Sequence, residues 1–159
     1  MKKPVQPVPE HLHTVTPRLV VSGAAAAIDF YVEAFGAEEL GRRFLTPDGK
    51  VVHAEIRIGD SVLFVTDEGD DGNGVSPASV NGRVTAIMAI SVPDVDRVWE
   101  RAVARGCEVV YPLADQFYGD RGGRLRDPFG QQWMLSTHIE DVGPDELNRR
   151  MRQWAEEGE

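Results

Sequence analysis

The chain contains one sequence pattern twice, about 70 residues apart. The segment Gly59-Asp60-Ser61-Val62-Leu63 is echoed 71 positions later by Gly130-Gln131-Gln132-Trp133-Met134. The segment Phe35-Gly36-Ala37-Glu38 is echoed 70 positions later by Arg105-Gly106-Cys107-Glu108. In a chain of 159 residues, such a repeat predicts one fold unit used twice. Two units of this kind can enclose a site between them, so their inward-facing residues are the first candidates for function.

Hydrophobic periodicity and turn residues predict the order β-α-β-β-β in each half. In the first half a helix is expected over 24–35, because apolar residues recur there at i, i+3, i+4 and i+7. Gly36 is expected to end this helix in the left-handed conformation. The strands are expected over 14–21, 38–45, 51–58 and 61–66. In the second half the helix is expected over 94–105 and the strands over 85–92, 108–113, 122–126 and 132–137.

The expected organisation is one compact α+β domain. Its parts are a flexible arm (1–13), a first module (14–68), a linker rich in Gly, Asp and Asn (69–83), a second module (84–139) and a C-terminal helix (144–157). That helix carries an apolar stripe of Leu147, Met151 and Trp154, which must cover either its own sheet or a second subunit. His11 and His13, beside the arm, are expected to be incidental.

Composition excludes several classes of partner. The formal net charge of −9 argues against nucleic acid and against an anionic membrane, since both require a basic surface. The single cysteine, Cys107, allows no internal disulfide, which favours a reducing cytoplasm. It is expected to be a small core residue rather than a nucleophile. No apolar run reaches transmembrane length, and residues 1–10 lack the apolar stretch of a signal peptide.

Several short motifs carry a resemblance to a known family. They are Ile28-Asp29-Phe30-Tyr31 with Phe35-Gly36-Ala37, Val92-Pro93-Asp94-Val95-Asp96, and Asp127-Pro128-Phe129-Gly130 with Trp133. With these motifs the chain resembles the vicinal-oxygen-chelate superfamily of glyoxalases, bleomycin-resistance proteins and dioxygenases over about 14–140. Thr16-Pro17, His53-Ala54-Glu55 and the segment 115–121 are similar to its PhnB-like branch, also called demethylubiquinone-methyltransferase-like. The resemblance implies two β-α-β-β-β modules paired into a pseudo-twofold incomplete barrel, or cup, with the C-terminal helix added.

The resemblance also implies where a metal would be held. Metal enzymes of the superfamily place four ligands, usually His and Glu, on the first and last strands of the two modules. The register of the repeat assigns these positions to Thr16, Leu63, Ile87 and Met134. Three of these side chains cannot chelate a hard cation and a threonine hydroxyl is a poor ligand, so no metal and no other cofactor is expected.

The strand over 51–58 carries the strongest candidates for ligand contact. His53, Glu55 and Arg57 alternate with the apolar residues Val52, Ala54, Ile56 and Ile58, so the polar set is expected to face away from the helix. The polar set is either a ligand-contact patch or a solvated sheet face with an ordinary ion pair. No catalytic residue is established, and His53 and Glu55 are the weak candidates for acid/base chemistry or for a displaced metal site.

The second module adds a polar rim and an apolar floor. Two or three of Arg121, Arg124 and Arg126, near the aromatic Tyr118, could clamp a carboxylate or phosphate, although structural pairing of these arginines with Asp120 and Asp127 is favoured. Gln132 and Met134 are expected to face inward, and Leu63, Ile87 and Met134 would make the floor of the cup apolar. The alternative is that these residues fill a small closed core.

A glycine-rich segment and a polar cluster in the second module are weaker candidates for function. Gly119, Gly122 and Gly123 would permit a mobile flap over the cup. His138, Glu140 and Asp141 are expected to be surface polar residues rather than metal ligands.

Two classes of function remain open. The first is a metal-free protein that binds a small hydrophobic or aromatic molecule for sequestration or resistance. The second is an enzyme: a lyase, isomerase or dioxygenase with a non-standard metal site, or a metal-free acid/base catalyst using His53 and Glu55. The expected partners are a small molecule and, by resemblance, a second copy of the chain in a homodimer.

Overall fold

The structure is a computed structural model that describes residues 5–70 and 74–157. It divides the chain into two compact units, Met1–Arg83 and Val84–Glu159. The first unit contains β1 (Arg18–Val21), α1 (Ala24–Phe35), β2 (Glu38–Leu45), β3 (Val51–Ile58), β4 (Ser61–Asp67) and the 3-10 helix η1 (Pro77–Val80). The second contains β5 (Met88–Ser91), α2 (Val95–Ala104), β6 (Glu108–Asp115), β7 (Asp120–Arg126), β8 (Gln132–His138) and α3 (Pro144–Glu157).

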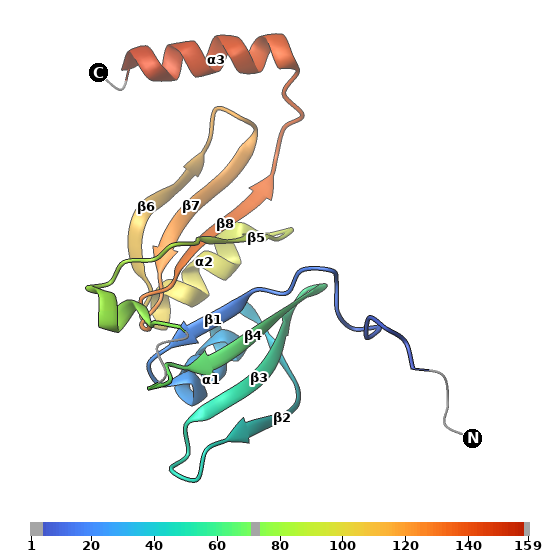
Figure 1. Cartoon of the computed structure of the whole chain (residues 1–159). Coiled ribbons are helices and arrows are strands. Elements are labelled where there is room, and N and C mark those ends of the chain that lie inside the picture. Colours follow the sequence, from blue (N-terminus) through green and yellow to red (C-terminus); the bar gives the residue numbers. More distant parts are fainter. Residues whose placement is uncertain (1–4, 71–73, 158–159) are drawn as a thin grey trace. The chain divides into compact units, whose positions relative to one another are not determined.

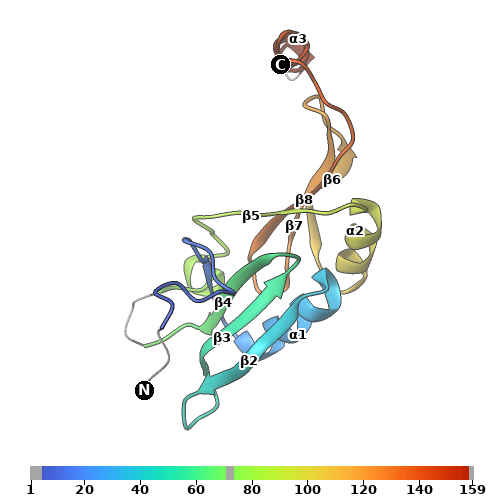
Figure 2. The same ribbon diagram turned by 90° about the vertical axis from the view of Figure 1, so that its right-hand side faces the viewer.

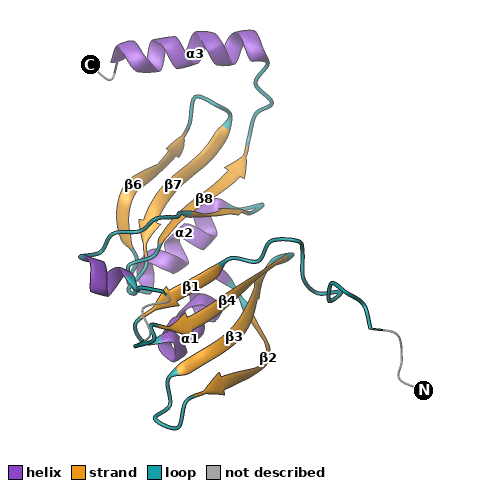
Figure 3. Ribbon diagram, viewed as in Figure 1, coloured by secondary structure: helices purple, strands orange, loops and turns teal. Residues whose placement is uncertain are grey.

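Each unit is a four-stranded mixed sheet with a helix following its first strand (Figure 1; Figure 3). The strand order is β1-β4-β3-β2 in the first sheet, here sheet A, and β5-β8-β7-β6 in the second, here sheet B. In both sheets the first strand runs parallel to the last, and the remaining pairs are antiparallel. The predicted β-α-β-β-β order is therefore confirmed within each unit, and the fold class is α+β.

Most predicted boundaries lie within a few residues of the observed ones, and two differ for a clear reason. β1 begins at Arg18 rather than near 14, directly after Pro17, whose carbonyl accepts a hydrogen bond from the Phe64 N–H. Part of the predicted linker is ordered as η1, which begins at Pro77 because proline suits the first helical turn. The linker residues 71–73 and residues 1–4 of the predicted arm lie outside the described residues.

The core of the first unit lies between α1 and one face of sheet A. Ala27, Ile28 and Tyr31 of α1 are fully buried. Figure 2 shows the helix lying along the sheet. Sheet A contributes to this core the buried side chains of Leu19, Val21, Ala54, Ile56, Leu63 and Val65. Gly36 ends the helix as predicted, with φ 70° and its N–H donating to the carbonyl of Tyr31.

In the second unit, α2 packs on sheet B over Leu125, Trp133 and Leu135, which are at most 1% exposed. The glycines predicted to permit a flap have a packing role here. A Cβ on Gly123 would lie 2.7 Å from the ring of Trp99, and one on Gly119 would lie 2.2 Å from the Glu140 carbonyl oxygen. These positions need glycine because neighbouring groups approach so closely.

The C-terminal helix α3 does not cover sheet B. None of its residues is buried, and Met151 and Trp154 are 50% and 61% exposed. It stands beyond the end of the β6–β7 hairpin (Figure 1; Figure 2). Arg150 holds it there with two hydrogen bonds to Glu140, of 2.7 and 2.8 Å. Among the described helices, none is long and apolar enough to cross a membrane.

Candidate functional site on sheet A

The face of sheet A opposite α1, here called the open face, carries polar and aromatic side chains from all four strands. Strand pairing places Phe44 of β2 beside His53 of β3, Glu55 of β3 beside Phe64 of β4, and Phe64 beside Arg18 of β1. Because directly paired residues project to the same side of a sheet, these five side chains share one face. The predicted placement of His53, Glu55 and Arg57 away from the helix is therefore confirmed.

Glu55 contacts two imidazoles on this face. Its Oε1 lies 3.2 Å from Nε2 of His53, and its Oε2 lies 3.0 Å from Nε2 of His11. In each pair the protonated imidazole nitrogen donates to the carboxylate oxygen. His53 and Glu55 are half-buried, whereas His11 is more exposed. His11 is therefore part of the site, contrary to the expectation that it is incidental.

Aromatic rings continue the site across the strands. The ring of His53 lies 4.7 Å from that of Phe64 and 6.1 Å from that of Phe44. The Arg18 guanidinium lies 5.8 Å from the Phe64 ring centroid, and the Arg42 guanidinium lies 5.4 Å from that of Phe44. A cation over a ring face is attracted by the ring quadrupole. The open face is thus an aromatic row with an arginine at each end.

Arg57 is paired as the sequence suggests, whereas the exposure of Val52 differs from the expectation. Arg57 forms an ion pair with Glu38 of β2, which fits the interpretation of an ordinary ion pair on the sheet. Val52 was expected to be buried with Ala54 and Ile56, but it is 52% exposed while Val51 is 1% exposed. The β2–β3 register shifts at this point, and such a bulge changes the phase of the alternation.

The predicted position of Leu63 is wrong by one residue. Leu63 pairs with Ile56 and is 6% exposed, so it packs toward α1 and cannot form the floor of an open site. Two residues, Gly59 and Asp60, separate β3 from β4, whereas β7 and β8 are separated by the five residues 127–131. Because these turns differ in length, an alignment of the two halves on Gly59 and Gly130 shifts β4 by one residue relative to β8. Strand pairing matches Phe64, not Leu63, to Met134.

In the second unit the predicted residues are only partly brought together. Arg124 pairs with Met134, and Arg126 with Gln132, so these side chains share the face of sheet B opposite α2. The guanidinium of Arg124 lies 5.0 Å from the ring centroid of Tyr111, not beside Tyr118. Tyr118 lies in the turn before β7, six residues from Arg124, which corresponds to roughly 20 Å along an extended strand. Arg124 therefore lies beside an aromatic ring, but this ring is Tyr111 rather than Tyr118, and the binding of an oxyanion by the arginines of this region stays a prediction.

The arrangement can be compared with known proteins. Residues 11–135 match the Glyoxalase/Bleomycin resistance protein/Dioxygenase superfamily. The chain belongs to this superfamily. An uncharacterised protein of Mycobacterium tuberculosis is 42% identical over 86% of this chain and 81% of its own length.

Solved structures agree with this membership. TioX from Micromonospora sp. ML1 is 25% identical, with a TM-score of 0.61 over 80% of this chain and 99% of its own. The PhnB protein from Bacillus cereus shares the fold at 19% identity, with a TM-score of 0.60 over 79% of this chain and 99% of its own.

The metal positions implied by the superfamily do not fit a metal ion in this chain. With the corrected register they hold Thr16, Phe64, Ile87 and Met134, of which only threonine offers an oxygen. Hard divalent cations require several carboxylate or carbonyl oxygens, and softer ones require imidazole or thiolate. Across residues 5–70 and 74–157, no group of three or more His, Cys, Asp or Glu side chains is placed to hold a metal ion.

Cys107 is a core residue, as predicted. It is 6% exposed, and burial raises the pKa of its thiol to about 12, with a smaller contribution from the Asp127 carboxylate. Because the thiolate is the nucleophilic form, this cysteine is inert at neutral pH.

His138 links β7 to the segment that leads to α3. Its Nδ1 lies 2.8 Å from Asp120 and its Nε2 2.9 Å from Asp141, and these hydrogen bonds, that to Asp120 first, raise the pKa of the imidazole. With both ring nitrogens occupied by carboxylates, His138 is a surface polar residue, as expected.

The raised pKa of His138 predicts a pH-dependent stability. The stabilisation is complete below the ordinary pKa of about 6.5 and is lost as pH rises through the higher folded-state value. His138→Gln should lower the urea midpoint at pH 6 and have little effect at pH 9. His13→Gln, at an exposed histidine, is the control and should change neither midpoint. An equal effect of His138→Gln at both pH values would contradict the prediction.

Proposed function

We propose that the protein binds a small planar hydrophobic or aromatic molecule on the open face of sheet A, without a resident metal ion, in sequestration or resistance. The observation that carries the proposal is the row of Phe44, His53 and Phe64, with Glu55 beside it. Phe44 is 52% exposed although it is a large apolar residue. Aromatic side chains next to a few oriented polar groups suit planar ligands with a polar substituent.

Arg57, Arg124, Gln132 and Met134 remain secondary candidates for ligand contact. Arg57 is already paired with Glu38. Arg124, Gln132 and Met134 offer a comparable polar and apolar surface on sheet B. Leu63 and Tyr118 are not part of the proposed site, for the reasons given above.

The metal-free part of the proposal rests on the donor set at the superfamily positions. Elemental analysis of the purified protein should find less than a stoichiometric amount of zinc, nickel, iron or manganese. A stoichiometric metal that is lost in His53→Gln or Glu55→Gln would overturn this part.

Binding is tested with a neutral planar probe, naphthalene-2-carboxamide, by isothermal titration calorimetry. Because aromatic pairs contribute about 0.5–1.5 kcal/mol, Phe64→Leu should weaken binding by roughly 3- to 10-fold while keeping apolar bulk. The matched control is Phe117→Leu, since Phe117 packs on Trp154 of α3 and not on sheet A. Equal affinity of the wild type and Phe64→Leu would place the binding site elsewhere, and no binding by the wild type would reject the function.

A metal-free acid/base enzyme is a second candidate, favoured by the hydrogen bond that orients His53 on Glu55. Under this alternative, the metal-stripped protein would turn over a carbonyl substrate such as a methylglyoxal–glutathione adduct, and His53→Gln would abolish the rate. Activity that survives His53→Gln would exclude the alternative.

We also propose a homodimer, which the exposed stripe of Met151 and Trp154 on α3 supports. Sedimentation equilibrium tests it, and a monomer at micromolar concentration would reject it. A cytoplasmic location is part of the same proposal and is supported by the inert, unpaired Cys107. Fractionation of the source cells would test it.

A further inference from the structure

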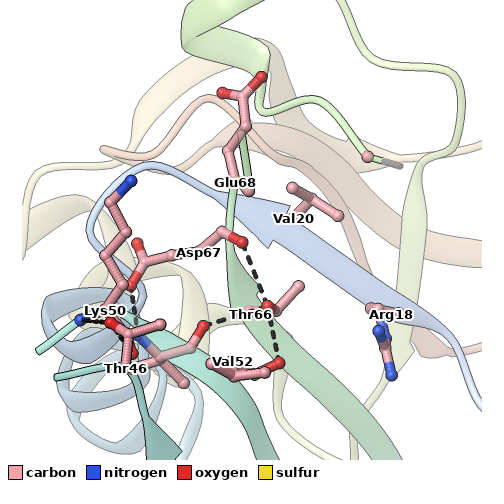
Figure 4. A pocket seen from close by; sticks show the side chains of 11 residues that line it. Arg18, Val20, Thr46, Lys50, Val52, Thr66, Asp67 and Glu68 are labelled. Atoms are coloured by element: carbon pink, nitrogen blue, oxygen red, sulfur yellow. Dashed lines mark hydrogen bonds between the residues drawn. The ribbon is translucent and has the colours of Figure 1, made fainter. Parts of the chain in front are cut away.

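A groove of about 220 Å³ lies within the first unit (Figure 4). Val20, Val52 and Thr66 line it between Arg18 and Lys50, which Figure 4 shows at its two ends. Gly74 closes one side, and a Cβ there would lie 2.9 Å from a methyl group of Val20. Only glycine allows that segment to lie so close to β1 without a shift of Val20.

The acidic groups of the groove are already engaged by the protein. Asp67 accepts backbone N–H bonds from Gly23, Ala24 and Val51, each at 2.8 Å. Glu68 accepts from the hydroxyls of Ser79 and Ser76, which lower the pKa of its carboxyl, Ser79 having the larger effect. The acceptors lining the groove thus serve the fold rather than a ligand.

The cationic groups of the groove are not engaged in the same way. Within the described residues, the guanidinium of Arg18 makes no hydrogen bond or ion pair, and it lies 5.8 Å from the ring centroid of Phe64. Lys50 lies 3.6 Å from Asp70, a carboxylate that is 99% exposed. A loose exposed pair of this kind contributes little. Among the described residues, the groove therefore offers side-chain N–H donors of Arg18 and Lys50 that are not engaged by the fold, next to the side chains of Val20, Val51 and Val52.

Arg18 joins the groove to the aromatic row, because it lines the first and lies over Phe64 in the second. We propose that the ligand is a planar aromatic oxyanion, whose carboxylate or phosphate lies in the groove at Arg18 while its ring lies on Phe64. Lys50, at the other end of the groove, adds positive charge. A guanidinium fork binds both kinds of oxyanion. This inference rests on the proposed function and adds the chemical class of the ligand.

The test compares two nearly isosteric ligands, naphthalene-2-carboxylate and naphthalene-2-carboxamide, by calorimetry at constant pH. The wild type should bind the carboxylate about tenfold more tightly than the amide, since charge-assisted hydrogen bonds are about twice as strong as neutral ones. Arg18→Gln should reduce this ratio to about one, because it should weaken carboxylate binding much more than amide binding. Lys50→Gln, at an exposed residue, is a second variant and should reduce the ratio in part.

The matched control is Arg43→Gln, which removes the same charge from the first unit but on the helix side, where Arg43 pairs with Asp29 of α1 and Glu39. It should retain the preference for carboxylate. Naphthyl-2-phosphate forms a further arm, and tighter binding than the carboxylate, lost in Arg18→Gln, would identify phosphate as the preferred oxyanion.

Two results would overturn the inference. Equal affinity for carboxylate and amide in the wild type would leave the proposed function standing and remove the oxyanion class. A preference that persists in the Arg18→Gln/Lys50→Gln double variant, with an unchanged circular dichroism spectrum, would do the same. Binding of neither compound would reject the proposed function together with the inference.

Discussion

Asp127→Ala should destabilise the second unit by about 4 kcal/mol, the largest effect expected of any single substitution proposed for this chain. Asp127 is 3% exposed, and its Oδ2 accepts a 2.8 Å hydrogen bond from the indole N–H of Trp133, itself 1% exposed. Its Oδ1 accepts the backbone N–H groups of Phe129 and Gln131 at 2.9 Å. Alanine would leave three donors without this acceptor. A buried unsatisfied group, here the indole N–H of Trp133, costs about 1–3 kcal/mol, and the two part-buried backbone N–H groups add smaller costs.

Urea unfolding followed by circular dichroism measures this effect. Asp127→Asn should cost about half as much, because one amide oxygen can still accept while the amide NH₂ replaces the other acceptor. The control is Asp60→Ala in the β3–β4 turn, where the exposed carboxylate accepts a hydrogen bond from Ser61. It should stay within about 0.5 kcal/mol of the wild type. A decrease in the free energy of unfolding of less than about 1 kcal/mol for Asp127→Ala would contradict the prediction. It would show that water can replace the carboxylate as the acceptor and that Asp127 does not stabilise the β7–β8 turn.

The turn 127–131, which contains Asp127, also explains why the sequence-based alignment of the two halves is wrong by one residue at β4. The pattern Gly59 and Gly130 correctly located two turns, and the periodicity correctly located α1, because both depend on local backbone preferences. Register is a property of the paired strands, and the turn before β8 has three more residues than the one before β4. Since side chains alternate, the resulting slip of one residue exchanged Leu63 for Phe64 and moved the predicted site residue to the wrong face.

Other parts of the site depend on contacts between residues far apart in sequence. His11 contacts Glu55 across 44 positions, and no local pattern near His11 predicts where the segment before β1 will lie. Phe44 becomes part of the aromatic row because β2 pairs with β3 at His53. Strand alternation sufficed to place His53 and Glu55 on the open face. It failed at Val52 because a bulge is not visible in the hydrophobic pattern.

In each unit, a side chain near the end of the last strand accepts hydrogen bonds from backbone N–H groups at the start of the helix, but the side chains differ. Asp67 ends β4, and its Oδ1 accepts the N–H groups of Gly23 and Ala24 where α1 begins. In the second unit, Thr137 near the end of β8 accepts the N–H of Val95, the first residue of α2, at 2.9 Å. Both residues satisfy helix N-terminal donors from the neighbouring strand. They lie 70 positions apart, which agrees with the corrected register of these two strands.

Asp67→Ala should therefore destabilise the first unit by about 2–3 kcal/mol. α1 has no cap of its own, since Gly23 at the N-cap provides no side chain, and loss of a cap typically costs about 1 kcal/mol. Asp67 also accepts the N–H of Val51 through Oδ2, so its loss frees the start of β3 as well. The negative charge adds a favourable interaction with the helix dipole.

Thr137→Val is the matched comparison, because it removes the hydroxyl that accepts from Val95 and donates to Val92 at 2.7 Å while keeping the branched shape. It should cost about 1–2 kcal/mol, less than Asp67→Ala, since one backbone donor rather than three loses its acceptor. Asp67→Asn should fall between the wild type and Asp67→Ala, because it keeps one acceptor oxygen. Urea midpoints for the three variants give the order. If Thr137→Val were the more damaging, the carboxylate would not be the main link between α1 and sheet A, and the three hydrogen bonds of Asp67 would be replaceable by water.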